Sequence, residues 1–360
     1  MLVVRGAIKD YDWGMTDGLA PWAGESTGGP QAELWFGVHP GGPSPLVDAD
    51  GDETGEVLAD KFDIAAIPLL VKLLAAARPL SVQVHPPLSA AAAGWQAQQT
   101  SGAPRVLSDP FEKTEMLIAL EPFEAFAGWR DREQVIAMLT EIDGAQGALK
   151  LLAAGDLGGV IRALLAIGTK ECIASLAAAA SSAGLSAAQV AAYVTVADNY
   201  PDDPGALVTV LLDYLSLAAG EAIYVPAGVP HSYIRGIGLE VMTSSDNVIR
   251  LGLTSKPVFV EHAIAALRPD LDPQIVRAVH GDILWPVNSP FVVRMLTEGS
   301  ERIPMGAYRI LLLIEGTAVV VSDAAEITLR PGTAAVMAAD DPDAYVEADG
   351  LVAIIQSTER

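Results

Sequence analysis

Residues 79–87 read Pro-Leu-Ser-Val-Gln-Val-His-Pro-Pro, and this stretch decides the fold that we expect. On a β-strand, successive side chains point to opposite faces. The apolar face here holds Leu80, Val82 and Val84, and the other face holds Ser81, Gln83 and His85. A face of Ser, Gln and His is unusual towards solvent, but it suits a sheet that lines a polar cavity and holds a metal ion. The stretch therefore predicts a β-barrel with an internal pocket.

The composition restricts the classes of protein and partner. A length of 360 residues predicts two or three domains, and 51% hydrophobic residues indicate a globular chain. A formal net charge of −23 argues against nucleic acid and anionic membranes as partners. An anionic ligand would need cations gathered at its own site, and the chain has only 22 Lys and Arg residues.

Targeting and redox signals are absent from the sequence pattern. The longest apolar run, residues 64–77, contains Pro68 and Lys72 and is too short to cross a bilayer. The first residues lack the pattern of a signal peptide, so we expect a cytoplasmic protein. Cys172 is the single cysteine, which excludes an internal disulfide and a thiolate metal site.

The sequence pattern divides the chain into successive β-rich and helical regions. Up to about residue 120 it is rich in Gly and Pro with short alternating runs, which is typical of β structure, with one helix expected at 67–78. Residues 131–200 are alanine-rich and helical in pattern, with capping pairs at Asp131/Gln134 and Ser186/Gln189. After Pro201 the β pattern returns. A helix is expected near 260–267, and a last β-rich region spans 291–356.

A second stretch, residues 220–231, reads Gly-Glu-Ala-Ile-Tyr-Val-Pro-Ala-Gly-Val-Pro-His. Here a strand ends in a Pro-Gly turn that directs the following His231 inward. The spacing resembles the second metal-binding motif of the cupins, which are small double-stranded β-helix barrels. A C-terminal echo at 332–340 lacks the histidine, so a cupin-like last domain is expected to have lost its metal.

These patterns predict a mainly β fold with an α-helical insert: two cupin-like (jelly-roll) β-barrels and a small helical domain. Residues 1–130 and 201–262 would form the catalytic cupin-like domain, and residues 131–200 the helical insert. Residues 263–360 would form a C-terminal cupin-like domain that lacks metal ligands.

Several motifs in fixed order resemble one family closely. They are Tyr11-Asp-Trp-Gly, the stretches at 30–40, 79–86 and 112–117, His231-Ser-Tyr, and the stretch from Glu240 to Lys256. Together they resemble type I mannose-6-phosphate isomerases over residues 10–256, whereas the C-terminal third matches in character only. The family implies a zinc-dependent aldose-ketose isomerase.

The resemblance implies one zinc ion per chain, bound by Gln83, His85, Glu115 and His231. Two imidazoles, a carboxylate and an amide oxygen form a set of N and O ligands that is compatible with zinc and leaves room for water or substrate. Taken alone, His85 and Gln83 fit better as a core histidine and its hydrogen-bond partner, and it is the four motifs together that favour the metal site.

The resemblance also implies catalytic roles for Arg250, Lys113 and Glu240. Lys113 alternates with Glu115, so on a strand both would face the metal, where a nearby cation disfavours the protonated amine, as a general base requires. Lys113 is therefore our candidate for moving the proton between C1 and C2. Glu240 is the competing base, and it is equally compatible with holding Arg250 in place.

The remaining family positions predict substrate contacts. Ser81 shares the polar face of its strand, and Trp13, Tyr233 and Asp246 match pocket positions of the family, although each also fits a wall or turn role. His39 belongs to a family motif without an evident chemical role.

The predicted activity is interconversion of D-mannose 6-phosphate and D-fructose 6-phosphate through an enediol. The predicted partner is a small sugar phosphate, and the chain is expected to be a monomer. Two alternatives remain: a non-catalytic sugar-phosphate-binding cupin, and an iron-dependent cupin oxygenase, which would use more histidines on its metal.

Overall fold

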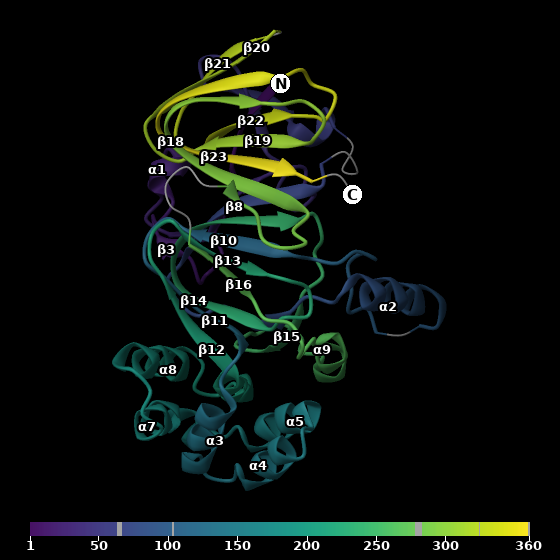
Figure 1. Cartoon of the computed structure of the whole chain (residues 1–360), viewed down its shortest axis with the longest axis vertical. Coiled ribbons are helices and arrows are strands. Elements are labelled where there is room, and N and C mark those ends of the chain that lie inside the picture. The colour runs from purple at the N-terminus through teal and green to yellow at the C-terminus, as the bar shows by residue number, and fades with distance from the viewer. Residues whose placement is uncertain (63–66, 103, 278–282, 324, 359–360) are drawn as a thin grey trace.

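The computed structural model describes residues 1–62, 67–102, 104–277, 283–323 and 325–358. Figure 1 shows two β-sheets that follow one another along the long axis, with a group of helices at one end. The expected mainly β fold with a helical insert is confirmed. In the described part of the chain, no helix is long and apolar enough to span a membrane.

The first sheet contains eleven antiparallel strands and is strongly curled (Figure 1). They are β2 (Ala7–Lys9), β5 (Glu33–Phe36), β8 (Leu69–Ala76), β9 (Val82–Val84), β10 (Glu115–Ala119), β11 (Phe123–Trp129), β12 (Leu212–Leu217), β13 (Glu221–Val225), β14 (His231–Thr243), β15 (Ile249–Gly252) and β16 (Gln274–Arg277). The long strand β14 pairs with β9 and β11 over its first part and with β8 and β10 over the rest. Gly236 lies where the partners change, at φ 134°, and a Cβ there would lie 2.5 Å from the Phe123 ring.

The helix expected at 67–78 was wrong, because this segment forms strand β8. All eight residues of β8 are buried, and the strand lies between β5 and β14. A strand that is buried on both faces carries a continuous apolar run, which periodicity alone does not distinguish from a buried helix. The tertiary position of the segment therefore decided its conformation.

The second sheet contains ten strands and takes them from both ends of the chain. They are β1 (Leu2–Arg5), β6 (Pro45–Val47), β7 (Glu53–Val57), β17 (Ile283–Leu284), β18 (Phe291–Ile303), β19 (Arg309–Leu313), β20 (Thr317–Ser322), β21 (Glu326–Leu329), β22 (Thr333–Met337) and β23 (Ala344–Ser357). Strand β1 pairs with β22, and β16 from the C-terminal third pairs with β13 of the first sheet. The sheets thus exchange strands across the expected domain boundaries, and the division into three domains stays a prediction. A separate small ribbon joins β3 (Met15–Thr16) to β4 (Pro30–Gln31).

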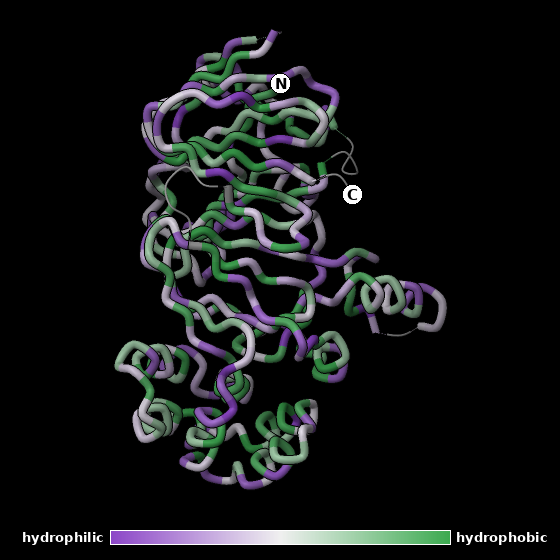
Figure 2. The backbone as a smooth tube through the Cα atoms, in the orientation of Figure 1, coloured by the Kyte–Doolittle hydropathy of each residue, from purple (hydrophilic) through white to green (hydrophobic). Residues whose placement is uncertain are grey.

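A shared apolar core joins the two sheets. It contains Val71, Met116 and Val241 from the first sheet together with Ile310 and Ile355 from the second. In Figure 2 the strands that contribute to this core carry long green, apolar stretches. Because side chains alternate along a strand, Met116 enters this core while its neighbour Glu115 faces the other way, towards the candidate site.

The helices are mostly gathered in one block beyond the first sheet (Figure 1). They are α3 (Arg132–Glu141), α4 (Gln146–Ala153), α5 (Leu157–Ile167), α6 (Lys170–Ala174), α7 (Leu176–Ser182) and α8 (Ala187–Asn199), with α1 (Ala20–Ala23), α2 (Leu88–Thr100) and α9 (Val260–Ala266) elsewhere and the 3-10 helices η1 (Leu58–Asp60) and η3 (Pro204–Leu211). Asp131 and Ser186 cap α3 and α8 as expected. The β pattern expected directly after Pro201 was wrong over η3 and right from β12 onward.

Candidate active site

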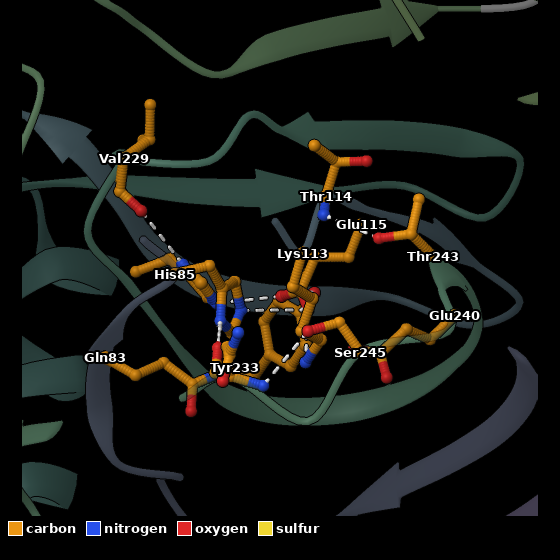
Figure 3. Close-up of polar contacts among 12 residues, drawn as sticks. Gln83, His85, Lys113, Thr114, Glu115, Val229, Tyr233, Glu240, Thr243 and Ser245 are labelled. Atoms are coloured by element: carbon orange, nitrogen blue, oxygen red, sulfur yellow. Dashed lines mark hydrogen bonds and ion pairs between the residues drawn. The ribbon is translucent and has the colours of Figure 1, made fainter. Parts of the chain in front are cut away.

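Three potential metal ligands converge on one face of the first sheet, and Figure 3 labels two of them, His85 and Glu115. Glu115 opens β10, His231 opens β14, and His85 follows β9. One ligand atom from each of the three lies within 4.8 Å of the others, and all three side chains are fully buried. This is the one such group of His, Cys, Asp and Glu found among the described residues. The ligands expected from motifs far apart in the sequence are therefore brought together.

The Glu115 carboxylate lies at the centre of the cluster. One oxygen is 2.8 Å from His231 Nε2 and accepts from the Tyr233 hydroxyl at 3.1 Å, while the other is 3.2 Å from His85 Nε2 and 2.9 Å from Lys113 Nζ. Burial by itself raises the pKa of Glu115, but Lys113 and the two imidazoles more than offset it and hold the pKa well below its usual value. The carboxylate is therefore charged, as a metal ligand must be.

Both imidazoles present Nε2 to the cluster because a main-chain carbonyl engages Nδ1. His85 Nδ1 lies 2.7 Å from the Asn247 carbonyl oxygen, and His231 Nδ1 lies 3.2 Å from that of Val229. Such outer contacts set the tautomer and orientation of a ligating histidine. Burial, and then Lys113, lower the pKa of His85 to about 4, so its ring is neutral and able to bind a metal at pH 7.

Gln83 completes the set of ligands expected for the metal. Its amide nitrogen is 3.0 Å from His231 Nε2, and its oxygen accepts from the Ser81 hydroxyl at 3.2 Å. Rotating the amide by 180° exchanges these atoms and directs the oxygen at the cluster. Two imidazole nitrogens, a carboxylate and an amide oxygen without any thiolate fit a zinc ion, so the chemistry of these residues suits the metal.

A cavity of about 370 Å³ opens above the cluster. Of the residues predicted to contact substrate or catalyse, it is lined by Trp13, Ser81, Gln83, Lys113, Tyr233, Glu240 and Arg250. Arg250 stands opposite Gln83 in the register of β15 and β9. Burial lowers the pKa of Arg250, and no carboxylate pairs with it in the part of the chain that the structure describes. An unpaired guanidinium inside a pocket is suited to an anionic ligand.

Glu240 does not hold Arg250, which was one expectation for it. Instead its carboxylate lies 3.1 Å from Lys72 Nζ, which is also 3.4 Å from the Glu33 carboxylate. Burial raises the pKa of Glu240, and Lys72 offsets this only in part. The pocket therefore contains a buried Glu33–Lys72–Glu240 ion network beside the candidate metal cluster.

Asp246 is placed apart from the other predicted site residues. It does not line the cavity, and its carboxylate lies 2.6 Å from His39 Nε2. The next residue, Asn247, uses its side-chain NH2 to donate to the Asp109 and Phe111 carbonyl oxygens, at 2.9 and 2.7 Å. The loop that carries Asp246 thus anchors the carbonyl that orients His85.

Sequence reasoning missed several residues at the site. Lys72 and Glu33 form the buried ion network, Arg78 and Lys256 line the cavity, and Asn247 contacts His85. A usable signal existed for Lys72, because a lone lysine within an otherwise apolar strand is costly to bury without carboxylate partners. The contacts of Arg78 and Asn247 join distant segments and left no such local signal.

Fold and site together define a cupin-type barrel protein with a candidate metal centre beneath a cation-lined pocket. A model of the type I phosphomannose isomerase catalytic domain matches residues 1–132. Mannose-6-phosphate isomerase of Salmonella typhimurium is 30% identical over 96% of this chain and 97% of its own length, and mannose-6-phosphate isomerase 1 of Arabidopsis thaliana is 31% identical over 76% and 72%. The chain belongs to the type I mannose-6-phosphate isomerase family.

Solved structures agree with this assignment. A mannose 6-phosphate isomerase bound with zinc and yttrium superposes with a TM-score of 0.83 at 28% identity, and a mutant of the Salmonella typhimurium enzyme superposes with a TM-score of 0.85 at 27% identity. Each match covers 100% of both chains. The expected family and enzyme class are confirmed.

Proposed function

We propose that the chain interconverts mannose 6-phosphate and fructose 6-phosphate with one zinc ion bound. The observation that carries the proposal is the buried His85–Glu115–His231 cluster beneath a cavity that Lys113 and Arg250 line. This arrangement combines a metal site, a group able to move a proton and an unpaired cation within one pocket. A metal-assisted aldose-ketose isomerisation of a sugar phosphate can use all three.

Gln83, His85, Glu115 and His231 would hold the zinc ion. Bound there, zinc would supply Lewis-acid polarisation of oxygens on the open-chain sugar. The Glu115 carboxylate that would bind the ion also lies 2.9 Å from Lys113 Nζ, which places this lysine beside the metal position.

Lys113 is our candidate for the proton transfer. With its amine neutral, it takes the proton from C2 of the open-chain aldose and delivers it to C1, while a proton passes from the C2 hydroxyl oxygen to the C1 oxygen, so that the aldose becomes a cis-enediol and then the ketose. Arg250 stabilises the negative charge that develops on the enediol oxygens or holds the substrate. Ser81, Trp13 and Tyr233 contact the sugar from the walls of the cavity.

Glu240 remains the competing base, because burial raises its pKa and so makes the carboxylate a stronger proton acceptor. Both candidates form an ion pair, Glu240 with Lys72 at 3.1 Å and Lys113 with Glu115 at 2.9 Å, so variants of the two residues are needed to distinguish them. Lys113→Met is expected to abolish turnover while zinc content stays near one per chain. Glu240→Gln is expected to keep measurable turnover. The opposite pattern would exchange the two assignments.

The first experiment is isomerisation of mannose 6-phosphate by the purified protein, before metal removal, after it and after zinc is returned. Activity is expected to disappear with the metal and return with zinc. Tight sugar-phosphate binding without turnover in a folded, zinc-loaded sample would contradict the proposal and favour a binding protein. Oxygen uptake restored by iron instead of zinc would favour the oxygenase.

A further inference from the structure

The pocket concentrates positive charge in a strongly acidic chain. Five of the chain's 22 Lys and Arg residues line it, at positions 72, 78, 113, 250 and 256. Lys72 and Lys113 are engaged by buried carboxylates. Arg250 and Lys256 have no carboxylate partner among the described residues, and Lys256 lies 5.9 Å from the Tyr11 ring. Arg78 differs from all of them, because its partner is on the surface.

Arg78 forms an ion pair with Asp12 at 2.5 Å. The Asp12 side chain is 84% exposed, whereas that of Arg78 is 37% exposed. An ion pair with a highly exposed partner contributes little stability, so a carboxylate held in this way exchanges readily with another anion. Both residues line the cavity, so the exchange would take place at the substrate pocket.

The ion pair leaves the Arg78 guanidinium incompletely satisfied. Its Nε is buried and has no hydrogen-bond partner in the described structure, while Asp12 engages a terminal nitrogen. A guanidinium binds phosphate through a fork of two parallel N–H donors, and a phosphate offers three oxygens. A phosphate is therefore a better match to Arg78 than the single contact with Asp12.

Arg78 stands at a defined place relative to the metal ligands. The segment that begins at Arg78 continues through Ser81 to Gln83, and five extended residues span at most roughly 17 Å. Tyr200, at the end of α8, donates its hydroxyl to the Pro79 carbonyl at 2.6 Å and also lines the cavity. A sugar with its reacting carbons at the metal cluster would extend its distal group along this segment.

We propose that Arg78 binds the phosphate group of the substrate and that Asp12 is an exchangeable counter-ion, which leaves when the phosphate arrives. The identity of the phosphate as part of a hexose phosphate rests on the proposed function. The exchange itself involves only Arg78 and Asp12 at the rim of the pocket. It predicts opposite changes in phosphate affinity when Arg78 and when Asp12 is substituted.

The test measures binding of inorganic phosphate to the zinc-loaded protein by calorimetry, together with KM and kcat for mannose 6-phosphate. Arg78→Gln is expected to raise both the phosphate Kd and KM about tenfold, with a much smaller change in kcat. Arg78→Lys is expected to recover part of the loss, because it restores charge without the fork. Asp12→Asn is expected to lower the phosphate Kd and KM about two- to fivefold, because the competitor is gone.

Asp10→Asn is the matched control. Asp10 is an exposed carboxylate two positions away and makes no ion pair with Arg78. Removal of its charge is expected to leave phosphate binding nearly unchanged. Equal changes of the phosphate Kd in Asp12→Asn and Asp10→Asn would contradict the role of Asp12 as an exchangeable counter-ion. An unchanged phosphate Kd in Arg78→Gln would show that Arg78 does not bind the phosphate. Calorimetry measures phosphate binding without turnover. If the wild-type protein does not isomerise mannose 6-phosphate but its variants change phosphate affinity as expected, the proposed activity is refuted and the phosphate site is not.

Discussion

At the scale of single residues, the feature with the largest expected effect on stability is a buried lysine in the middle of an apolar strand. Lys72 is almost fully buried in β8, lies between the Glu33 and Glu240 carboxylates, and has the Trp35 ring 5.1 Å away. Burial alone lowers the pKa of Lys72, but Glu240 and Glu33 more than offset it and raise the pKa above its ordinary value. Lys72 is therefore charged and compensates two buried carboxylates.

Lys72→Met is expected to lower the free energy of unfolding by about 3–5 kcal/mol at pH 7, because it leaves buried carboxylates without a cation. The pKa of Glu240, which burial already raises, then rises further in the folded state, because the Lys72 charge that lowers it is gone. The folded variant then binds more protons than its unfolded chain does. The loss in its free energy of unfolding, relative to wild type, therefore becomes smaller as the pH falls from 7 towards 5. Urea unfolding at both pH values measures this.

Lys9→Met is the control for this prediction, because Lys9 also lies over the Trp35 ring, 4.8 Å from its centre, without a carboxylate partner among the described residues. Its effect is expected to stay within about 0.5 kcal/mol. A deficit in Lys72→Met that is independent of pH would contradict the explanation by buried charge.

At the scale of elements, the loop between β14 and β15 orients one metal ligand. Asn247 is fully buried, and its side-chain oxygen accepts from the backbone N–H of Ser108 at 2.8 Å while its NH2 group reaches Asp109 and Phe111. Its main-chain carbonyl faces His85 Nδ1. The loop is thus fastened to the segment that leads into β10, and two strands carrying ligands are held in one arrangement.

Asn247→Ala is expected to weaken zinc binding about 10- to 100-fold, because loss of these hydrogen bonds frees the carbonyl that sets the His85 tautomer. Chelator competition measures the affinity directly. Asn199→Ala, which removes one hydrogen bond to Thr195 at the end of α8, serves as the matched control. Equal zinc affinity in the two variants would show that the loop does not position His85.

At the scale of the whole molecule, the two sheets behave as one packed body. Strand β1 belongs to the second sheet, β16 belongs to the first, and one apolar core lies between the sheets. The fully buried Phe291 of β18 contacts Tyr224 of β13 across this core, with ring centroids 6.2 Å apart. Unfolding of either sheet would expose to water the apolar face of the other sheet that packs against it.

Phe291→Ala is expected to lower the free energy of unfolding by about 3–5 kcal/mol and to shift the melting of both sheets together. Far-UV circular dichroism and release of zinc on heating are expected to give coincident transitions. Tyr345→Ala, whose side chain is 55% exposed on β23, is expected to have little effect. If zinc stays bound at temperatures well above the melting of the second sheet, the two sheets unfold independently.

The sequence by itself determined the local features of the protein. The turn before His231 and the capping residues Asp131 and Ser186 depend on neighbours in the chain, and the structure bears out each of them. The alternation expected over residues 79–87 is borne out in strand β9, which spans Val82–Val84. The four expected metal ligands also followed from motifs, and the structure places them together. The zinc ion and the catalytic roles stay predictions.

Only the tertiary structure decided which distant groups meet. It made residues 69–76 a strand, because burial between two other strands outweighs a helix-like apolar pattern. It paired Glu240 with Lys72 instead of Arg250, and placed Arg78 beside Asp12 at the rim of the pocket. The physical reason is that strand register and barrel closure set distances between residues far apart in the chain, whereas sequence patterns report only which face a side chain shares with its neighbours.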